Sequence, residues 1–529
     1  MEPSLPAASP IGQALGVLLF AAQWVLLLRT SWRQLPIGRA VSALLAASLY
    51  VAFGLLPPAA AFAAVSLPTL ALLTGCMLVS AHAEKAGAFD ALAAALLQGG
   101  GGRAYFLLRV SCFSAVASAL VTNDSACVLL PPVVIKACRA RGYRATPFLI
   151  AVATASNIGS ACSPIGNPQN MIIASASGAS FRAFLAAIGI AAALALCINT
   201  AVIVFVHREE FLSAEAVAPP TAPPTAPPAA PPAAPAAVAT AAAAAVESEP
   251  ARLLGSLSGS LDASLESISI AAPGEEAQAS FTAVTATPPR HAADQSAGDS
   301  STYPLAKPPP SPPLPPAPAA PAAPALPAAP PLRARAVQAI LLALPLALIF
   351  ADQWVGLSWL VLLAGSVLCA VDGGDPDAIL AKVDAKLLLF FAGLFASVAG
   401  LRATGLPAEL FDAALAPGAA ALRSAGELLA FGLLVLVGSN TISNVPLVLL
   451  LAPRLGAAAA PWLVLAWVST VAGNLTLLGS VANIIVAEVA AREGEALGFG
   501  AYLRVGAPST LLCLLVLTPL VWALAQAAQ

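Results

Sequence analysis

Residues 154–170 read TASNIGSACSPIGNPQN, a stretch rich in Ser, Asn, Gly and Pro that lies between apolar runs at about 147–156 and 170–175. Gly and Pro break helices, and Pro also lacks a backbone N–H donor. In a bilayer, a broken backbone is tolerated only where protein or a water-filled cavity satisfies its polar groups. The stretch therefore predicts a membrane helix that is interrupted at a functional cavity.

The composition of the whole chain is that of a helical membrane protein. Of its 529 residues, 59% are hydrophobic and 9% are charged, and the mean hydropathy is +0.87. Soluble domains carry roughly 25% charged residues, whereas a membrane-spanning helix needs about 20 mostly apolar residues. The 24 Lys and Arg against 26 Asp and Glu leave no basic excess, which excludes a nucleic-acid-binding protein.

The apolar runs fall into two groups that a linker separates. The predicted N-terminal transmembrane repeat covers residues 11–206, and the C-terminal repeat covers residues 336–525. Residues 208–335 between them are mostly Pro, Ala, Ser and Glu. Such a segment cannot bury enough apolar surface to offset the entropy of ordering, and its prolines favour polyproline II. We expect a disordered Pro/Ala-rich linker on the cytoplasmic side.

The two halves repeat each other weakly. An Asn-to-Pro spacing of nine positions and a Gly-to-Asn spacing of four occur in the same order in both halves. The pairs are Asn123 with Pro132 and Gly166 with Asn170 in the first half, and Asn444 with Pro453 and Gly479 with Asn483 in the second. Two matched spacings in one order favour a duplicated architecture.

Basic residues flank the segment 104–135 on both sides, at Arg103 and in the loop 136–146. Because Lys and Arg favour the cytoplasmic side, both ends lie there, which predicts a re-entrant hairpin. Counting onward, the segment 427–453 enters from the opposite side, so the halves are inverted, as in many transporters. The predicted fold is an all-α polytopic membrane protein of two inverted repeats, each with a re-entrant hairpin and a broken transmembrane helix.

Four polar stretches interrupt the apolar runs, at residues 122–125, 154–170, 439–446 and 469–483. In one interpretation their Asn, Ser and Thr side chains only join helices to one another. Breaks at matching positions of two inverted halves indicate instead a solute site near the membrane midplane, where helix N-termini and freed carbonyls face the solute.

Asp124 is the ionisable residue of these stretches. An ionisable residue in an apolar segment indicates a functional site. Burial disfavours the ionised form of a carboxylate, which suits a proton carrier. A sodium ligand and a purely structural helix cap are the alternatives. Arg109, within an apolar run, either snorkels or pairs with Asp124. We predict that Asp124 is the coupling carboxylate.

The remaining charges and cysteines predict no further site. Charged residues at 82–90 and 372–386 are interpreted as loops at the membrane surface. The eight cysteines are scattered through apolar runs without a CxxC pair, which favours neither a disulfide framework nor a zinc site. No GxxxxGK[ST], HExxH or GxSxG motif occurs, so we predict no enzyme and no cofactor.

The interrupted stretches resemble the ion transporter superfamily that contains arsenite permeases, NhaD-type sodium–proton antiporters and citrate or dicarboxylate carriers. The most specific match is the string 156–170, which resembles the arsenite permease branch and especially plant-type silicon efflux transporters. Residues 122–132 and 443–453 resemble the paired hairpin tips of the superfamily, and residues 472–483 resemble the second broken helix.

The resemblance covers residues 40–206 and 336–525 and leaves out the linker. It implies that each half contributes one hairpin and one broken helix to a central site. It also implies secondary transport by alternating access, coupled to protons or sodium, and a homodimer formed through a scaffold domain. The implied partners are a small inorganic or organic solute, the coupling ion and the lipid bilayer. The expected location is a plasma membrane.

The predicted function is secondary active transport of a small oxyanion or metalloid hydroxide such as silicic acid or arsenite. Amides and hydroxyls suit an uncharged polyhydroxy solute because they donate and accept hydrogen bonds without a counter-charge. The predicted solute- and ion-binding residues are Thr122, Asn123, Asp124, Ser125, Asn157, Gly166, Asn167, Asn170, Ser443, Asn444, Asn474, Thr476, Gly479 and Asn483.

Among these residues, Asn123, Asp124 and Asn444 are the candidate sodium ligands, and no other metal site and no catalytic residue is predicted. A citrate or dicarboxylate carrier and a sodium–proton antiporter are the alternatives within transport. A membrane enzyme and a non-transporting membrane scaffold are the alternatives outside it.

Overall fold

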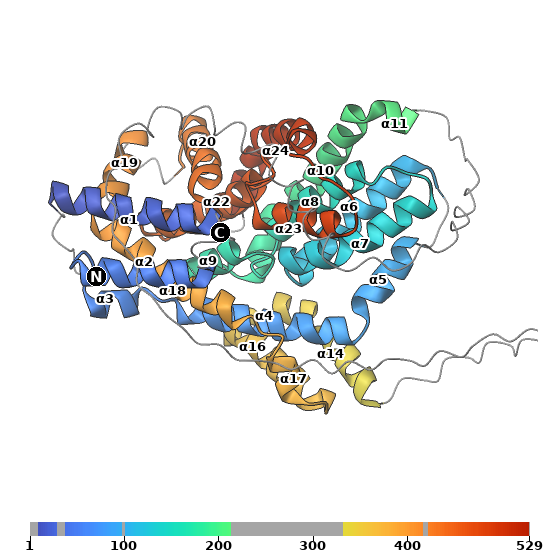
Figure 1. Cartoon of the computed structure of the whole chain (residues 1–529), viewed down its shortest axis with the longest axis horizontal. Helices are drawn as coiled ribbons and strands as arrows, with labels where there is room; N and C mark the ends of the chain where they lie inside the picture. The colour runs from blue at the N-terminus through green and yellow to red at the C-terminus, as the bar shows by residue number, and fades with distance from the viewer. Residues whose placement is uncertain (1–8, 29–37, 98–100, 213–331, 416–421, 528–529) are drawn as a thin grey trace, which may run out of the picture. The chain divides into compact units, whose positions relative to one another are not determined.

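The computed structural model describes residues 9–28, 38–97, 101–212, 332–415 and 422–527, and every regular element among them is a helix. Figure 1 shows these helices in their order along the chain. The prediction of an all-α protein is confirmed for this part of the chain.

Eight of the described helices are long and apolar enough to cross a membrane. They are α1 (Pro10–Leu28), α4 (Leu67–Lys85), α6 (Arg103–Leu120), α10 (Phe181–Val206), α14 (Leu332–Phe350), α18 (Ala385–Ala403), α20 (Ala425–Ile442) and α24 (Phe499–Ala527). The chain is therefore a multi-pass integral membrane protein, as its hydropathy predicts.

Other helices complete the two halves. They are α2 (Arg39–Ala52), α7 (Asn123–Ala140), α8 (Thr146–Ala161), α9 (Pro168–Ser177), α16 (Leu357–Asp372), α21 (Asn444–Leu451), α22 (Ala459–Ala472) and α23 (Val481–Arg492). Short connecting helices are α3 (Pro58–Ala63), α5 (Ala88–Leu97), α11 (Arg208–Leu212), α15 (Asp352–Val355), α17 (Pro376–Leu380), α19 (Leu406–Ala414) and the 3₁₀ helix η2 (Ala452–Arg454).

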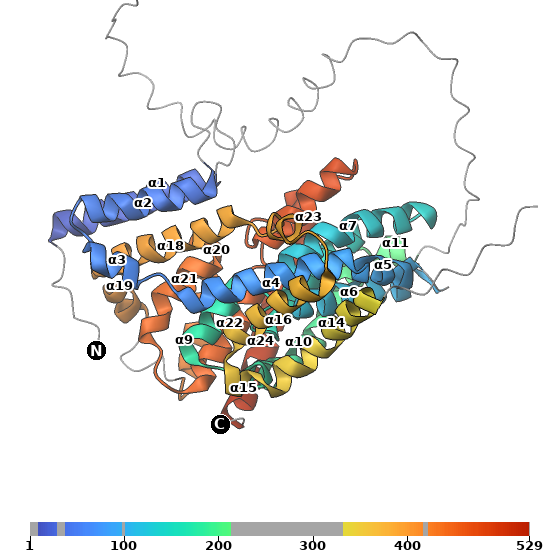
Figure 2. The ribbon, with the colours of Figure 1, turned by 90° about the horizontal axis from the view of Figure 1, so that it is seen from below.

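Helices of one half pack on helices of the other in a reciprocal pattern. Helix α2 packs on α18 while α4 packs on α16, and α10 packs on α24 (Figures 1 and 2). Exchanging α2 with α16, α4 with α18 and α10 with α24 leaves this set of contacts unchanged. An approximate two-fold relation between the halves produces this pattern, in agreement with the predicted repeats.

Two glycines at equivalent places bring these helix pairs close together. A Cβ atom added to Gly75 of α4 would lie 2.7 Å from the backbone nitrogen of Leu362 in α16. A Cβ atom added to Gly393 of α18 would lie 2.7 Å from the backbone nitrogen of Leu44 in α2. Small residues at helix crossings allow this approach in membrane proteins. Close helix approach at a glycine thus occurs at equivalent places in both halves.

Both predicted hairpins are present. Helices α6 and α7 contact each other and meet at Val121 and Thr122, and the side chain of Thr122 accepts a hydrogen bond from the Ser125 backbone N–H at the start of α7. In the second half, α20 and α21 contact each other and meet at Ser443. Each hairpin thus places a polar turn between two apolar helices.

Both predicted broken helices are present as well. The break between α8 and α9 covers residues 162–167, and the break between α22 and α23 covers residues 473–480. Helices α8 and α22 contact each other and are buried along almost their whole length, with Trp467 of α22 among the largest fully buried side chains. The two breaks therefore lie in the interior of the helical assembly.

The predicted surface loops need correction, and the predicted bounds of the linker stay open. The loop interpretation of residues 82–90 is wrong for residues 82–85, which end α4, and for residues 88–90, which begin α5, and the predicted loop 372–386 contains α17. His82 is fully buried in α4 with its Nε2 atom 3.4 Å from Sγ of Cys369. Helix α11 and the start of α14 lie inside the range 208–335 predicted for the linker. The rest of that range, residues 213–331, lies outside the described residues, so the domain boundaries stay predictions.

Candidate functional site

The tip of the first hairpin is attached to the first broken helix. The backbone N–H of Asn123 donates to the carbonyl of Gly166 over 2.8 Å, and its side-chain Nδ2 donates to Oδ1 of Asn157 over 3.3 Å. Asn123 is 5% exposed. The hairpin turn therefore seats its amide directly against the break between α8 and α9.

Asn157 is the centre of a hydrogen-bond network that crosses between the halves. Its Nδ2 atom donates to Oδ1 of Asn474 over 2.8 Å and to Oδ1 of Asn483 over 3.0 Å. Its Oδ1 atom also accepts from Oγ of Ser480 over 3.2 Å. Asn474 in turn donates to the carbonyl of Thr154 over 3.0 Å. The two broken helices are thus joined side chain to side chain.

Asn170 and Asn483 have the same task in the two halves. The Nδ2 atom of Asn170 donates to the carbonyls of Ser160, Ala161 and Ser163 at 3.1, 3.3 and 3.1 Å. The Nδ2 atom of Asn483 donates to the carbonyls of Gly473 and Thr476 at 2.8 and 3.1 Å.

Helix ends leave carbonyls without intrahelical partners, and a membrane interior offers no bulk water to satisfy them. Each Asn supplies the missing donors at its break. We therefore interpret both side chains as residues that position the breaks, rather than as direct solute ligands.

Asn167 and Thr470 join the same region from opposite halves. Oδ1 of Asn167 accepts from the Asn170 backbone N–H over 3.0 Å and caps α9, while its Nδ2 atom donates to Oγ1 of Thr470 over 3.2 Å and to Oγ of Ser160 over 3.0 Å. Thr470 also lies within hydrogen-bonding distance of Gln169 and Asn170.

The glycines of the two breaks have no room for a side chain. A Cβ atom on Gly166 would lie 2.5 Å from the carbonyl oxygen of Ser160, and one on Gly479 would lie 2.6 Å from Oδ1 of Asn440. Asn440 also donates to the carbonyl of Ala472 over 2.9 Å and lies 3.5 Å from the hydroxyl of Thr476. Thus Asn440 attaches the second hairpin to the second break, as Asn123 attaches the first.

The second hairpin tip differs from the first in its geometry. Ser443 adopts φ +69° and ψ 159°, a region of backbone conformation that is almost confined to Gly. The side chains of Ser443 and Asn444 make no hydrogen bond to the Asn157 network within the described residues. Twelve of the predicted positions thus lie at the first tip and the two breaks, whereas Ser443 and Asn444 form the second tip.

Both hairpin tips bury one unpaired amide oxygen. Oδ1 of Asn123 and Oδ1 of Asn444 have no hydrogen-bond partner among the described residues, and the two side chains are 5% and 7% exposed. A buried acceptor left without a donor costs about 1–3 kcal/mol. The same deficiency at matched positions of two halves favours a bound species that supplies donors or positive charge to both.

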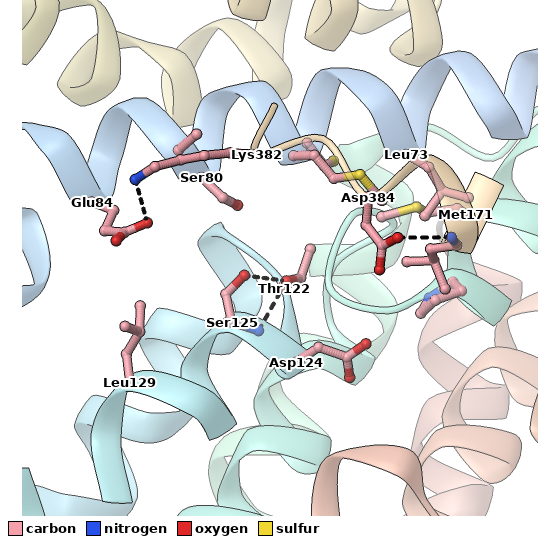
Figure 3. A pocket seen from close by; sticks show the side chains of 15 residues that line it. Leu73, Ser80, Glu84, Thr122, Asp124, Ser125, Leu129, Met171, Lys382 and Asp384 are labelled. Carbon is pink, nitrogen blue, oxygen red and sulfur yellow. Dashed lines mark hydrogen bonds and ion pairs between the residues drawn. The ribbon is translucent and has the colours of Figure 1, made fainter. Parts of the chain in front are cut away.

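A cavity of about 250 Å³ lies in front of the first hairpin tip. Figure 3 shows Thr122, Asp124 and Ser125 on one side of it, and Glu84 and Lys382 on the other. The cavity wall includes both apolar and polar side chains of α4, α7 and α9. Asp124, one residue from Asn123, thus faces the cavity while Asn123 faces the network behind it.

Two predictions about charges can now be compared with the structure. Arg109 donates to the carbonyl of Ala95 and lies over the ring of Tyr105, so the alternative in which it pairs with Asp124 is wrong. In the described part of the chain, no three His, Cys, Asp or Glu side chains come close enough to hold a metal ion.

Several residues of the network were missed in the prediction of single site residues. They are Thr154, Ser160, Asn440, Thr470 and Ser480. Asn199 was missed as well, and it joins the halves outside the breaks. Asn199 lies in the apolar run of α10, donates to Oγ1 of Thr154 over 2.9 Å and accepts from Ser509 over 2.8 Å. An amide within a membrane helix is itself a signal for such a contact between helices.

Comparison with known proteins gives consistent similarities. A family model described as "Citrate transporter" matches residues 18–472. A Dictyostelium discoideum protein that carries the name transporter arsB is 38% identical over 501 residues, which is 92% of this chain and 88% of that protein. The silicon efflux transporter LSI3 of Oryza sativa subsp. japonica is 35% identical over 522 residues, 96% of this chain and 97% of that protein.

Proposed function

The chain belongs to the citrate transporter family, and we propose that within this family it is a secondary active transporter of a small metalloid hydroxide or oxyanion, such as silicic acid or arsenite, that works by alternating access. The transported species binds between the two hairpin tips and the two broken helices. The coupling ion is a proton or sodium.

This proposal rests on the Oδ1 atoms of Asn123 and Asn444. Both are buried acceptors without donors, at matched hairpin tips. A neutral hydroxide carries several O–H donors, and it also accepts hydrogen bonds from amide N–H groups. In the residues that the structure describes, the network around Asn157 contains amides and hydroxyls and no Lys or Arg. These features suit a solute that is rich in hydroxyls and has no net charge.

The names of two relatives support the same class of solute. One is named a silicon efflux transporter and the other bears the name arsB, and both align over most of this chain. The family model carries the description "Citrate transporter", which keeps citrate or a dicarboxylate as the second candidate. A carboxylate solute would be served best by a basic side chain, and the described network supplies none.

Asp124 is the proposed coupling group. It faces the cavity in front of Asn123, and Figure 3 marks no hydrogen bond or ion pair between Asp124 and the other residues of the lining. A carboxylate that is reached from a cavity and borders the solute site can exchange a proton or hold sodium together with Asn123. By family analogy, we also propose a homodimer and a plasma-membrane location.

The test is solute flux into proteoliposomes that contain the purified full chain, under an imposed pH or sodium gradient. Silicic acid, arsenite, citrate and sodium are offered separately. We expect gradient-driven uptake of silicic acid or arsenite that Asp124→Asn abolishes. The control is Asp377→Asn, because Asp377 also lies in a helix first turn but is exposed and outside the cavity.

Each alternative has its own outcome in this experiment. Citrate uptake without hydroxide uptake identifies a carboxylate carrier on the same fold. Sodium flux in the absence of any solute identifies a sodium–proton antiporter. Absence of all four fluxes in a folded, reconstituted chain overturns the transport proposal and favours a membrane scaffold.

A further inference from the structure

An ion pair lies at the mouth of the cavity that contains Asp124. Nζ of Lys382 is 3.1 Å from Oε2 of Glu84, and the two side chains are 43% and 52% exposed. Cys76 and Met171, which line the same cavity, are 3% and 0% exposed. This difference places the ion pair at the rim and the two apolar residues at the floor. Figure 3 shows the pair across the cavity from Asp124 and Ser125.

The pair joins the two halves of the chain. Glu84 lies in the last turn of α4, whereas Lys382 follows α17 and precedes α18. Neither residue was predicted as part of a site, since both belong to the charged segments interpreted as surface loops. Their position on the cavity wall gives the pair a role that sequence position alone did not indicate.

The charges of the cavity wall are unbalanced. Among the described residues, its lining contains three carboxylates, at Glu84, Asp124 and Asp384, and one ammonium group, at Lys382. The side chain of Asp384 accepts a hydrogen bond from the backbone N–H of Leu387 and caps the N-terminus of α18. Of the lining residues that the structure describes, Lys382 is therefore the cation that can change the charge of the wall.

We propose that the Glu84–Lys382 ion pair sets the charge selectivity of this cavity. By holding the ammonium group at Glu84, the pair cancels the positive charge of the lining and leaves Asp124 and Asp384 to set the local potential. A negative potential raises the concentration of cations in the cavity and lowers that of anions, and it leaves the concentration of neutral solutes unchanged. Of the two solute forms in the proposed function, the cavity thus admits the uncharged hydroxide and not the oxyanion, and it likewise excludes carboxylate and phosphate anions.

This inference rests on the proposed function only in that the cavity is taken as the path of the solute. The potential of the cavity is a property of its charges and can be measured without transport. The chain also contains a matched control pair. Lys85, which follows Glu84 in α4, forms an ion pair of 2.5 Å with Asp372 of α16. Neither Lys85 nor Asp372 lines the cavity.

The experiment measures how fast charged thiol reagents reach the cavity. Leu129, which lines the cavity and is not a proposed ligand, is replaced in the full chain by Leu129→Cys. The purified protein in liposomes reacts with a cationic trimethylammonium-ethyl methanethiosulfonate or with an anionic sulfonatoethyl methanethiosulfonate. Peptide mass spectrometry reads the labelling at residue 129, separately from the native cysteines, and rates are divided by those of a free thiol.

The expected result is a cationic-to-anionic rate ratio of about ten or more at residue 129 in the parent. Adding or removing one unit charge near the reporter changes this ratio by about fivefold. Glu84→Gln should lower the ratio, because it frees the ammonium group, and Lys382→Gln should raise it. The double variant should return the ratio to within about twofold of the parent. Lys85→Gln and Asp372→Asn should leave it unchanged.

A salt titration of the parent keeps the test decisive if a charge variant does not fold. The screening length falls from about 10 Å at 0.1 M to about 3 Å at 1 M ionic strength, so the ratio must fall toward one. A ratio near one at low salt, a ratio insensitive to salt, or equal effects of the Lys85 and Glu84 variants would overturn the proposal.

Failure of the proposed function has a different signature. If the labelling ratios follow the expected pattern but no solute is transported, the charge selectivity stands and the transport proposal falls. If hydroxides are transported but the ratios do not depend on Glu84 and Lys382, the transport proposal stands and this inference falls.

Discussion

The Nδ2 atom of Asn157 donates to Oδ1 of Asn474 over 2.8 Å, so an amide of the first broken helix binds directly to an amide at the second break. Asn157 is 2% exposed and Asn474 is 1% exposed. Hydrogen bonds between membrane helices stabilise by about 1 kcal/mol each, and a buried group left unpaired costs more. The contact therefore serves both to position the site and to hold the halves together.

Removal of the Asn157 side chain is expected to affect stability and transport together. Asn157→Ala leaves Asn123, Asn474, Asn483 and Ser480 each without one partner. We expect the free energy of unfolding to fall by about 2–3 kcal/mol and flux per folded molecule to be lost. Thermal unfolding in detergent and flux in proteoliposomes measure the two effects.

The control for this prediction is Asn199→Ala. Asn199 also joins the halves, through Thr154 and Ser509, but it lies in α10 outside the breaks. We expect a similar loss of stability with flux per folded molecule retained. Equal flux in the two variants would contradict the assignment of Asn157 to the site.

Gly75 and Gly393 are expected to tolerate no side chain. Gly75→Ala and Gly393→Ala each place a methyl group 2.7 Å from the backbone of a neighbouring helix, so the helices must separate. Overpacking of this kind costs about 1–3 kcal/mol. Because the two positions are equivalent, we expect both variants to lower the midpoint of thermal unfolding by similar amounts.

Gly432 provides the matched control for these two glycines. It is also helical, in α20, but a Cβ atom there would meet nothing within 4 Å. Gly432→Ala is expected to be neutral or to stabilise by about 0.5–1 kcal/mol through helix propensity. A loss at Gly432 as large as at Gly75 would show that helix crossing does not explain the sensitivity.

The backbone breaks and hairpins could be predicted from the sequence because their causes are local. Gly, Pro and Asn in an apolar run, as in 156–170, disrupt a helix wherever it packs. The meeting of Asn123 with Asn157 also agrees with the prediction, since both lie at breaks of the same half. Pairing across halves, as between Asn157 and Asn474, depends on tertiary packing that no local pattern specifies.

Other parts of the site were out of reach for the same reason. Thr470 is one hydroxyl in an apolar helix, and such hydroxyls commonly bond their own helix backbone. Only the packing of α22 against α9 brings it to Asn167. Glu84 and Lys382 are nearly 300 positions apart in the chain and meet only because α4 and the α17–α18 turn converge. Within the part of the chain that the structure describes, the side chains of Ser443 and Asn444 lack the hydrogen bonds that Thr122 and Asn123 make at the first hairpin tip. Matched sequence positions therefore do not guarantee matched contacts.

Ser443 is expected to be a strained residue that Gly would relieve. Its φ of +69° and ψ of 159° lie in a region that costs a residue with a side chain about 1–3 kcal/mol. Ser443→Gly should therefore raise the free energy of unfolding by about 1 kcal/mol, and Ser443→Val should lower it. Denaturation in detergent measures the difference.

The comparison for Ser443 is Ser180, which caps α10 in an extended conformation. There φ is −73° and Oγ accepts the Ala183 backbone N–H. Ser180→Gly gains nothing from relief of strain and loses the cap, so we expect a small destabilisation of a few tenths of a kcal/mol. Stabilisation at both positions would mean that the conformation of Ser443 carries no strain.

Shortening the linker is expected to leave transport intact. The site, its network and its cavity are made of residues within 73–171 and 382–483, whereas residues 215–330 have a composition that cannot form a packed core. Replacing 215–330 by a Gly/Ser linker of about 30 residues, with an r.m.s. span of about 30 Å, should still allow the halves to associate. We expect gradient-driven flux equal to that of the full chain, while Asp124→Asn in the shortened chain abolishes it. Loss of flux from a shortened chain that remains folded and monodisperse would instead assign an essential role to the linker, which the scaffold alternative requires.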